Sequence, residues 1–158
     1  PAEPLRITNL NLGGYQVAEN DLRSGRLLYT DRSYIFNDPI PSALYLQTYI
    51  RTRQADRDTT APAGFLSFDV NQNVVVYVGI DQRIITLPSW LQGWQRESIH
   101  LQNTDHGSPA RFLFSKRFPM GKIVLGPNRD PGMPMGRSMY SVIIVPQVTA
   151  ARDWMIYQ

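Results

Sequence analysis

The feature that most constrains the fold is a pair of short strand-like segments joined by a polar turn. Apolar and polar side chains alternate over Phe65–Val70, and Val74–Ile80 is rich in β-branched residues. The intervening Asn71–Asn73 has the composition of a tight turn. This pattern predicts a β-hairpin, the basic unit of an antiparallel sheet.

Similar short segments, bounded by Gly, Pro, Asn or Asp, recur along the chain. The further candidate strands are 26–29, 33–36, 43–52, 98–101, 111–118, 122–125 and 139–145. No segment has a sustained apolar period of 3.6 residues with caps, so we expect helix only near 88–94. The sequence predicts an all-β fold, a single jelly-roll-like antiparallel β-sandwich of about nine or ten strands.

The length of 158 residues suits one domain. We assign 1–146 to the β-sandwich module and 147–158 to a C-terminal tail. The tail contains Trp154, Ile156 and Tyr157, and we expect it to pack on the sheet edge or on a neighbouring chain, because so much exposed apolar area lowers solubility.

Strand alternation predicts where the long loops lie. If consecutive strands are antiparallel, loops 52–64 and 81–97 emerge from one end of the sandwich. Loops 102–110 and 126–138 then emerge from the other end. One strand that breaks the alternation would change part of this assignment.

The residue inventory disfavours catalysis. The absence of cysteine excludes disulfides, thiolate metal sites and cysteine nucleophiles. His100 and His106 accompany no Gly-x-Ser-x-Gly motif, and the three glutamates lie in predicted loops or termini, which gives no support for a glycosidase pair. We expect no enzyme activity and no cofactor.

Asp56 and Asp58 are candidate ligands for a structural calcium ion, although the intervening arginine disfavours a cation.

The basic residues are almost all arginine. The formal net charge is +3, and 14 of the 16 basic residues are arginine. The planar guanidinium group binds carboxylate, sulfate and phosphate groups in bidentate fashion, which indicates an anionic partner. A charge of +3 is small for a nucleic-acid-binding protein, and aspartates interrupt the basic clusters, so we do not expect nucleic acid as the partner.

Five residues in the two loops assigned to the same end are candidates for a binding site. Arg53, Arg57 and Arg83 offer guanidinium groups for an anion, and Trp90 and Trp94 offer flat faces for sugar rings. The alternative for the arginines is that they brace loops through ion pairs with aspartates. The alternative for the tryptophans is that one or both plug the end of the sandwich.

A group of segments resembles a β-sandwich accessory module found at the ends of secreted bacterial carbohydrate-active enzymes and other extracellular proteins. The segments are 31–36, 49–52, 65–72, 75–78, 81–83, 87–94, 114–116 and 124–126. The resemblance covers about Ile7 to Pro146, and its most specific part is Pro-Ser-Trp-Leu-x-Gly-Trp at 88–94. It implies an extracellular, non-catalytic module that binds carbohydrate, and it supplies no binding residues. The loop 126–137 is longer and less polar than in that module, and the tail 148–158 lies outside it.

Together these observations predict a secreted or cell-surface module that binds polysaccharide, preferably acidic, through arginines and an exposed aromatic side chain. No membrane insertion is expected, because no apolar run has the length of a membrane span. The alternative is a structural or assembly subunit of a cell-surface layer, filament or extracellular complex. Its association would use the extended segment Pro1 to Leu12 or the tail Arg152 to Gln158, either of which could add a strand to a neighbour's sheet.

Overall fold

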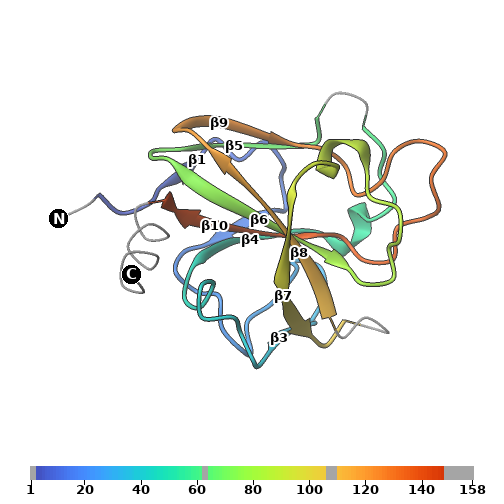
Figure 1. The fold of residues 1–158 in the computed structure, drawn as a ribbon, viewed down its shortest axis with the longest axis horizontal. Helices are drawn as coiled ribbons and strands as arrows, with labels where there is room; N and C mark the ends of the chain where they lie inside the picture. Colours follow the sequence, from blue (N-terminus) through green and yellow to red (C-terminus); the bar gives the residue numbers. More distant parts are fainter. Residues whose placement is uncertain (1–2, 62–63, 106–109, 148–158) are drawn as a thin grey trace.

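The computed structural model describes residues 3–61, 64–105 and 110–147, and these form two stacked antiparallel sheets (Figure 1). Of the described residues, 41% are in strands and 5% in helices, which confirms the predicted all-β sandwich. The strands are β1 (Ile7–Thr8), β2 (Gln16–Ala18), β3 (Phe36–Asn37), β4 (Thr48–Arg51), β5 (Leu66–Val70), β6 (Val74–Asp81), β7 (Gln95–Asn103), β8 (Ala110–Phe118), β9 (Gly121–Leu125) and β10 (Ser141–Pro146). Two short 3-10 helices, η1 (Gln54–Asp56) and η2 (Ser89–Leu91), lie in loops. No helix in the described ranges is long and apolar enough to cross a membrane.

The smaller sheet has the order β1-β5-β9, and the larger has the order β2-β4-β10-β6-β8-β7-β3. The apolar strands β6 and β10 lie at the centre of the larger sheet, where Val78 pairs with both Val142 and Phe114. Phe68 of β5 and Ile123 of β9 belong to the same buried cluster. The predicted hairpin is present as β5 and β6, but these strands enter different sheets, so its turn connects the two layers.

The N-terminal segment bonds to its own chain. Ile7 and Thr8 pair with Val70 and Asp69 of β5, and the Arg6 amide donates to Asn71 Oδ1 at 2.7 Å. These described contacts extend the smaller sheet by one strand. Self-association through this segment stays a prediction, and the tail 148–158 lies outside the described residues.

Residues 27–37 contact the larger sheet at two distant places, next to β7 and next to the end of β4. β3 pairs with β7 at one edge, Leu27 forms an antiparallel bridge with Ile35, and Tyr29 forms a parallel bridge with Thr52 just after β4. The predicted strands 26–29 and 33–36 are therefore mostly isolated bridges. The predicted strand 43–52 begins only at Thr48, because the Leu44 amide closes a turn on the Pro41 carbonyl at 2.9 Å.

The loop arrangement predicted from strand alternation is wrong. β6 and β7 are both antiparallel to β8, so they run parallel to each other, and the long segment 82–94 crosses back along the molecule between them. Consequently segments 52–61, 81–87, 104–105 and 126–140 gather at one end, on the right in Figure 1. We call this the loop end. Direct contacts confirm it: Arg129 Nε donates to the Asp58 carbonyl at 3.1 Å, and Asn128 Nδ2 donates to the Arg57 carbonyl at 3.1 Å.

A buried ionic network lies under the loop end. Arg111, at the start of β8, is fully buried and donates to Asp105 at 3.0 Å, to the Met139 carbonyl at 2.7 Å and to the Tyr29 hydroxyl. Tyr29 in turn donates to Asp105 at 2.7 Å. Asp81, also fully buried, is the strand partner of Arg111. The network joins three chain segments that are distant in sequence.

Breaking the Arg111–Asp105 pair should destabilise the fold strongly. Arg111→Met or Asp105→Leu alone leaves a buried charge without its main partner, and we expect each to lower the free energy of unfolding by about 3–5 kcal/mol. The double variant should be less destabilised than the sum of the two, because neither charge is then left alone. Urea unfolding of the four proteins measures both effects, and additive losses would contradict the coupling.

Buried tyrosines should make the protein sensitive to alkali. Burial raises the pKa of Tyr29 and of Tyr140 well above 10, so both phenols stay neutral in the folded protein. In the unfolded chain they ionise near pH 10. Their contribution is therefore complete below pH 10, and above it the free energy of unfolding should fall by up to about 1.4 kcal/mol per pH unit for each. Urea unfolding between neutral and strongly alkaline pH measures the slope.

The matched control for that slope is Tyr45, which is 51% exposed. Tyr140→Phe should flatten the alkaline fall relative to the parent, whereas Tyr45→Phe should leave it unchanged. A slope that is the same in all three proteins would contradict the assignment.

Candidate functional site

The loop end contains an open cleft of about 340 Å³ whose rim is dominated by arginine. We call it the arginine cleft. Its lining residues are Arg32, Tyr34, Gln54, Arg57, Arg83, Asp105, Gly136 and Arg137. Four guanidinium groups from four separate segments therefore surround one hollow.

The four arginines differ in how many hydrogen bonds and ion pairs their guanidinium groups already form within the protein. Arg83 is held by Asp81, with Nη2 to Oδ2 at 2.7 Å and Nε to both carboxylate oxygens, and these bonds raise the pKa of Arg83. Arg32 pairs with Asp31 at 3.2 Å. Arg57 lies 3.9 Å from Asp58, and its Nη1 donates to the Gln54 carbonyl at 3.2 Å. The exposed guanidinium of Arg137 has no hydrogen bond or ion pair to any described residue. The cleft thus offers unused donors to an anion.

The polar residues beneath the cleft fix its shape. Asp31 accepts hydrogen bonds from the Gln54 and Ala55 amides at 2.8 and 3.0 Å, which holds the start of η1. The side chain of Gln54 then donates to the Arg137 carbonyl at 3.2 Å and accepts from the Met139 amide at 2.8 Å. One glutamine therefore locks loop 52–61 to the segment that carries Arg137.

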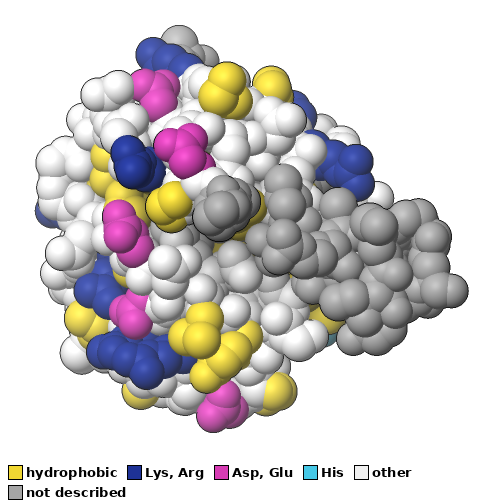
Figure 2. All heavy atoms as spheres, turned by 90° about the vertical axis from the view of Figure 1, so that its left-hand side faces the viewer, with side chains coloured by type: hydrophobic (Ala, Val, Ile, Leu, Met, Phe, Trp, Pro, Cys, Tyr) yellow, Lys and Arg dark blue, Asp and Glu magenta, His cyan; other side chains and the backbone are white. Residues whose placement is uncertain are grey.

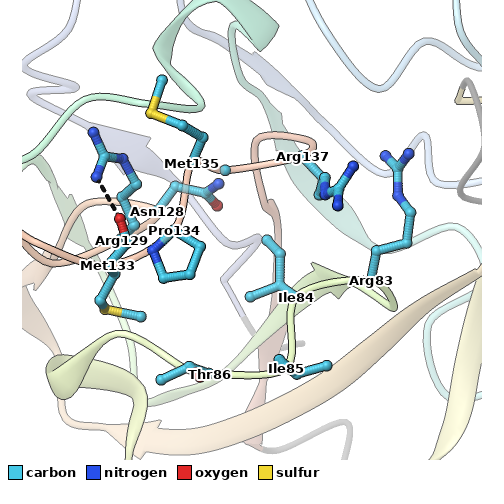
Figure 3. A pocket seen from close by; sticks show the side chains of 11 residues that line it. Arg83, Ile84, Ile85, Thr86, Asn128, Arg129, Met133, Pro134, Met135 and Arg137 are labelled. Carbon is cyan, nitrogen blue, oxygen red and sulfur yellow. Dashed lines mark hydrogen bonds between the residues drawn. The ribbon is translucent and has the colours of Figure 1, made fainter.

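A second hollow of about 160 Å³ adjoins the arginine cleft, and we call it the apolar pocket (Figure 3). Its apolar lining comes from Ile84, Ile85, Met133, Pro134 and Met135. Arg83, Gly136 and Arg137 line both hollows, so the two share a wall. Figure 3 shows the side chains of Arg83 and Arg137 side by side at one rim.

A hydrogen-bonded loop supports the apolar pocket. Arg129 Nη1 donates to the Met133 carbonyl at 2.9 Å, and Asp130 accepts from the Ser89 amide at 2.8 Å. The Met133 amide also donates to the Asp130 carbonyl at 3.2 Å. These bonds connect loop 126–138 both to itself and to η2.

The predicted tryptophans contact their own protein rather than either hollow. Trp90 packs edge-to-face on Tyr140 and on Trp94, with ring centroids 5.6 Å apart in both pairs, and its Nε1 donates to the Pro127 carbonyl at 2.6 Å. Trp94 packs on Phe118 at 5.8 Å. Neither tryptophan lines the cleft or the pocket, and Tyr34 is the aromatic residue of the cleft.

The predicted arginines are divided in the same way. Arg57 and Arg83 meet in the arginine cleft, whereas Arg53 lies outside its lining. The Arg53 side chain passes over Gly14, where an added Cβ would lie 3.0 Å from Arg53 Cδ. A ligand-binding role for Arg53, Trp90 and Trp94 stays a prediction.

The calcium candidates have protein partners. Asp56 accepts a hydrogen bond from Tyr15 at 2.7 Å, and Asp58 lies beside Arg57. Across the described ranges, no three acidic or histidine side chains converge as a metal site requires. Calcium binding stays a prediction.

Sequence reasoning missed Arg32 and Arg137 as site residues. Arg137 was assigned to the opposite end, because the alternation rule did not allow for the parallel relation of β6 and β7. The unusual length of the segment between those strands was the signal for a crossover connection. Arg32 follows an isolated bridge region and has no local pattern that marks a site.

The end of the molecule opposite the loops has a mixed surface. Figure 2 shows that Lys and Arg side chains are interspersed with Asp and Glu there. The lining of the arginine cleft differs in composition, with four arginines and one acid, Asp105.

A glycine controls the wall shared by the two hollows. A Cβ on Gly136 would lie 2.2 Å from the Arg57 carbonyl oxygen and 2.7 Å from Asn128 Nδ2. Gly136→Ala should therefore push the two loops apart and lower the free energy of unfolding by about 1–3 kcal/mol. Gly13→Ala is the control, because nothing lies within 4 Å of the added Cβ. Thermal denaturation compares the two, and equal melting temperatures would contradict the close contact.

Comparison with known proteins identifies the fold. No family model matches the chain, and no curated protein matches it. It is similar to a domain of a β-glucuronidase from glycoside hydrolase family 2, with a TM-score of 0.75 and 22% identity over 89% of this chain and 14% of that one. It is also similar to part of a glycoside hydrolase family 138 enzyme targeting pectin rhamnogalacturonan II, with a TM-score of 0.55 and 12% identity over 88% of this chain and 16% of that one. The chain therefore spans about a seventh of these enzymes, and it has the β-sandwich fold of a domain that occurs in carbohydrate-active enzymes.

Proposed function

We propose that this chain is a non-catalytic module that binds an acidic polysaccharide through the arginine cleft. The observation that carries the proposal is the convergence of Arg32, Arg57, Arg83 and Arg137 on one open hollow. Each well-placed guanidinium can form a charge-assisted bidentate bond with a carboxylate or a sulfate. An array of several suits an anion that repeats along a polymer better than a single small anion.

The contacts of the cleft favour a uronate-containing polymer. Tyr34 offers an aromatic face next to the arginines, as a sugar ring with a carboxylate requires. The two similar enzymes are named for a glucuronide and for a rhamnogalacturonan, and each of these compounds contains a uronic acid. Their likeness to this chain is one of fold, and the arginines are what connect this chain to that chemistry.

The number of acidic residues in the cleft supports a non-catalytic role. Glycoside hydrolysis requires two carboxyl groups that flank the scissile bond. Asp105 is the one acid among the described lining residues, and its carboxylate is bonded to Arg111 and Tyr29 in the buried network. The proposal places the module outside the cell or on its surface, where such polymers are found, and as part of a larger carbohydrate-active enzyme.

Removing two arginines of the cleft tests the proposal. The Arg57→Ala/Arg137→Ala double variant should bind polygalacturonate at least tenfold more weakly than the parent, equivalent to about 1.4 kcal/mol. Its melting temperature should fall only slightly, because Arg137 is exposed and the half-buried Arg57 loses one hydrogen bond, to the Gln54 carbonyl at 3.2 Å. Added salt should weaken the binding of the parent, since exposed charges are screened beyond about 10 Å at 0.1 M. Titration calorimetry measures all of these affinities.

The control is Arg117→Ala on β8, an exposed arginine at the far end of that strand from the cleft. It should bind as the parent does, and a neutral glucan should not compete with polygalacturonate. If the parent binds no uronate polymer, or if Arg117→Ala weakens binding as much as the double variant does, the proposal is wrong.

A further inference from the structure

The apolar pocket has features that the binding of a simple uronate does not use. Ile85 and Met135 at its mouth are 93% and 63% exposed, so two large apolar side chains border a hollow at the molecular surface. Aliphatic and thioether side chains suit a small apolar substituent, whereas sugar rings prefer aromatic faces. The pocket therefore indicates a ligand with an apolar group next to its anionic one.

A buried amide also faces this pocket. Asn128 is 1% exposed, and its Nδ2 donates to the Arg57 carbonyl at 3.1 Å and to the Ser138 carbonyl at 3.0 Å. These two bonds fix which side of the amide carries oxygen. The oxygen, Oδ1, has no hydrogen-bond partner among the described residues, and Figure 3 shows the amide directed into the space beside Pro134 and Met135. A buried acceptor without a partner is costly, so a ligand donor would be favoured there once the neighbouring side chains shift to uncover the oxygen.

The pocket thus offers one acceptor, an apolar wall and two neighbouring guanidinium donors. An acetamido group presents the complementary set, which is one N–H donor, one methyl group and one carbonyl acceptor. An O-acetyl group and a methyl ether both lack the N–H donor and would leave Asn128 Oδ1 unpaired.

We propose that the apolar pocket is a subsite for the N-acetyl group of a hexosamine adjacent to the uronate in the arginine cleft. The preferred ligand is then an acidic polysaccharide in which uronate and N-acetylhexosamine are neighbours. In the bound state the acetamido N–H donates to Asn128 Oδ1, the methyl group contacts Ile85 and Met135, and the carbonyl accepts from Arg137 or Arg83. This inference rests on the proposed function and specifies its substrate class.

Three oligosaccharide probes test the inference by calorimetry with the full chain. Hyaluronan oligosaccharides combine uronate with N-acetylhexosamine, oligogalacturonates of equal carboxylate number contain uronate alone, and chitin oligosaccharides contain N-acetylhexosamine alone. Hyaluronan should bind at least about fivefold more tightly than oligogalacturonate, as one additional hydrogen bond predicts. Chitin should bind more weakly than either acidic probe.

Variants at the pocket mouth separate this subsite from the arginine cleft. Ile85→Ser/Met135→Ser changes two exposed side chains, so the fold should be kept. It should weaken hyaluronan binding, because the contacts with the methyl group are lost, while leaving oligogalacturonate binding unchanged. The control is Met120→Ser/Val124→Ser, because these side chains are similarly exposed at 65% and 50% but lie outside both hollows. The control should bind every probe as the parent does.

The two proposals fail in different ways. If oligogalacturonate binds but hyaluronan binds no better, or if the serine pair weakens both acidic probes equally, the acetamido subsite is wrong and the arginine cleft stands. If neither acidic probe binds, both proposals are wrong.

Discussion

The loop end depends on one buried cation. Arg111 is the largest fully buried side chain among the described residues, and removing a guanidinium from water costs several kcal/mol unless its donors are paired. The chain pairs the two terminal nitrogens, Nη1 and Nη2, by bringing Asp105, Tyr29 and the Met139 carbonyl to the start of β8. Those three residues lie in three different segments, so satisfying Arg111 also determines where the segments that bear the arginine cleft are placed.

Strand β6 packs directly beside this cation. Gly79 on β6 faces the Arg111 side chain, and an added Cβ there would lie 3.4 Å from Arg111 Cβ and 3.6 Å from its Cδ. These are ordinary van der Waals distances, so the arginine side chain packs closely on this part of β6. Two residues further on, Asp81 holds Arg83, so strand β6 first accommodates a buried arginine and then anchors one that reaches the cleft.

The sequence was sufficient to predict the class of fold and two arginines of the candidate site, Arg57 and Arg83, but not the rest of that site. Alternation over Phe65–Val70 and the β-branched run after it identify a hairpin, because these patterns depend on neighbouring residues alone. The position of Arg137 depends instead on the parallel relation of β6 and β7, which is a long-range property of the sheet. From the sequence, Arg111 is predicted to be an ordinary solvent-facing residue of a strand, since no local pattern distinguishes a buried arginine from a solvated one. The Trp90–Trp94 pair is conspicuous in sequence, but its partners Tyr140 and Phe118 are distant in the chain.

The arginines of the loop end form a graded series, and this gradation relates stability to binding. Arg111 is fully buried and used in folding, Arg83 is held by Asp81, Arg57 has a distant ion pair, and Arg137 has no described partner. Asp81 and Asp105 pair with Arg83 and Arg111, and Asp31 and Asp58 lie beside Arg32 and Arg57. Among the described residues, Arg137 is therefore the cleft arginine whose charge has no acidic partner. An anion that binds there meets one arginine already fixed in place, which lowers the entropy cost of the contact, and one free arginine that can adapt to the ligand.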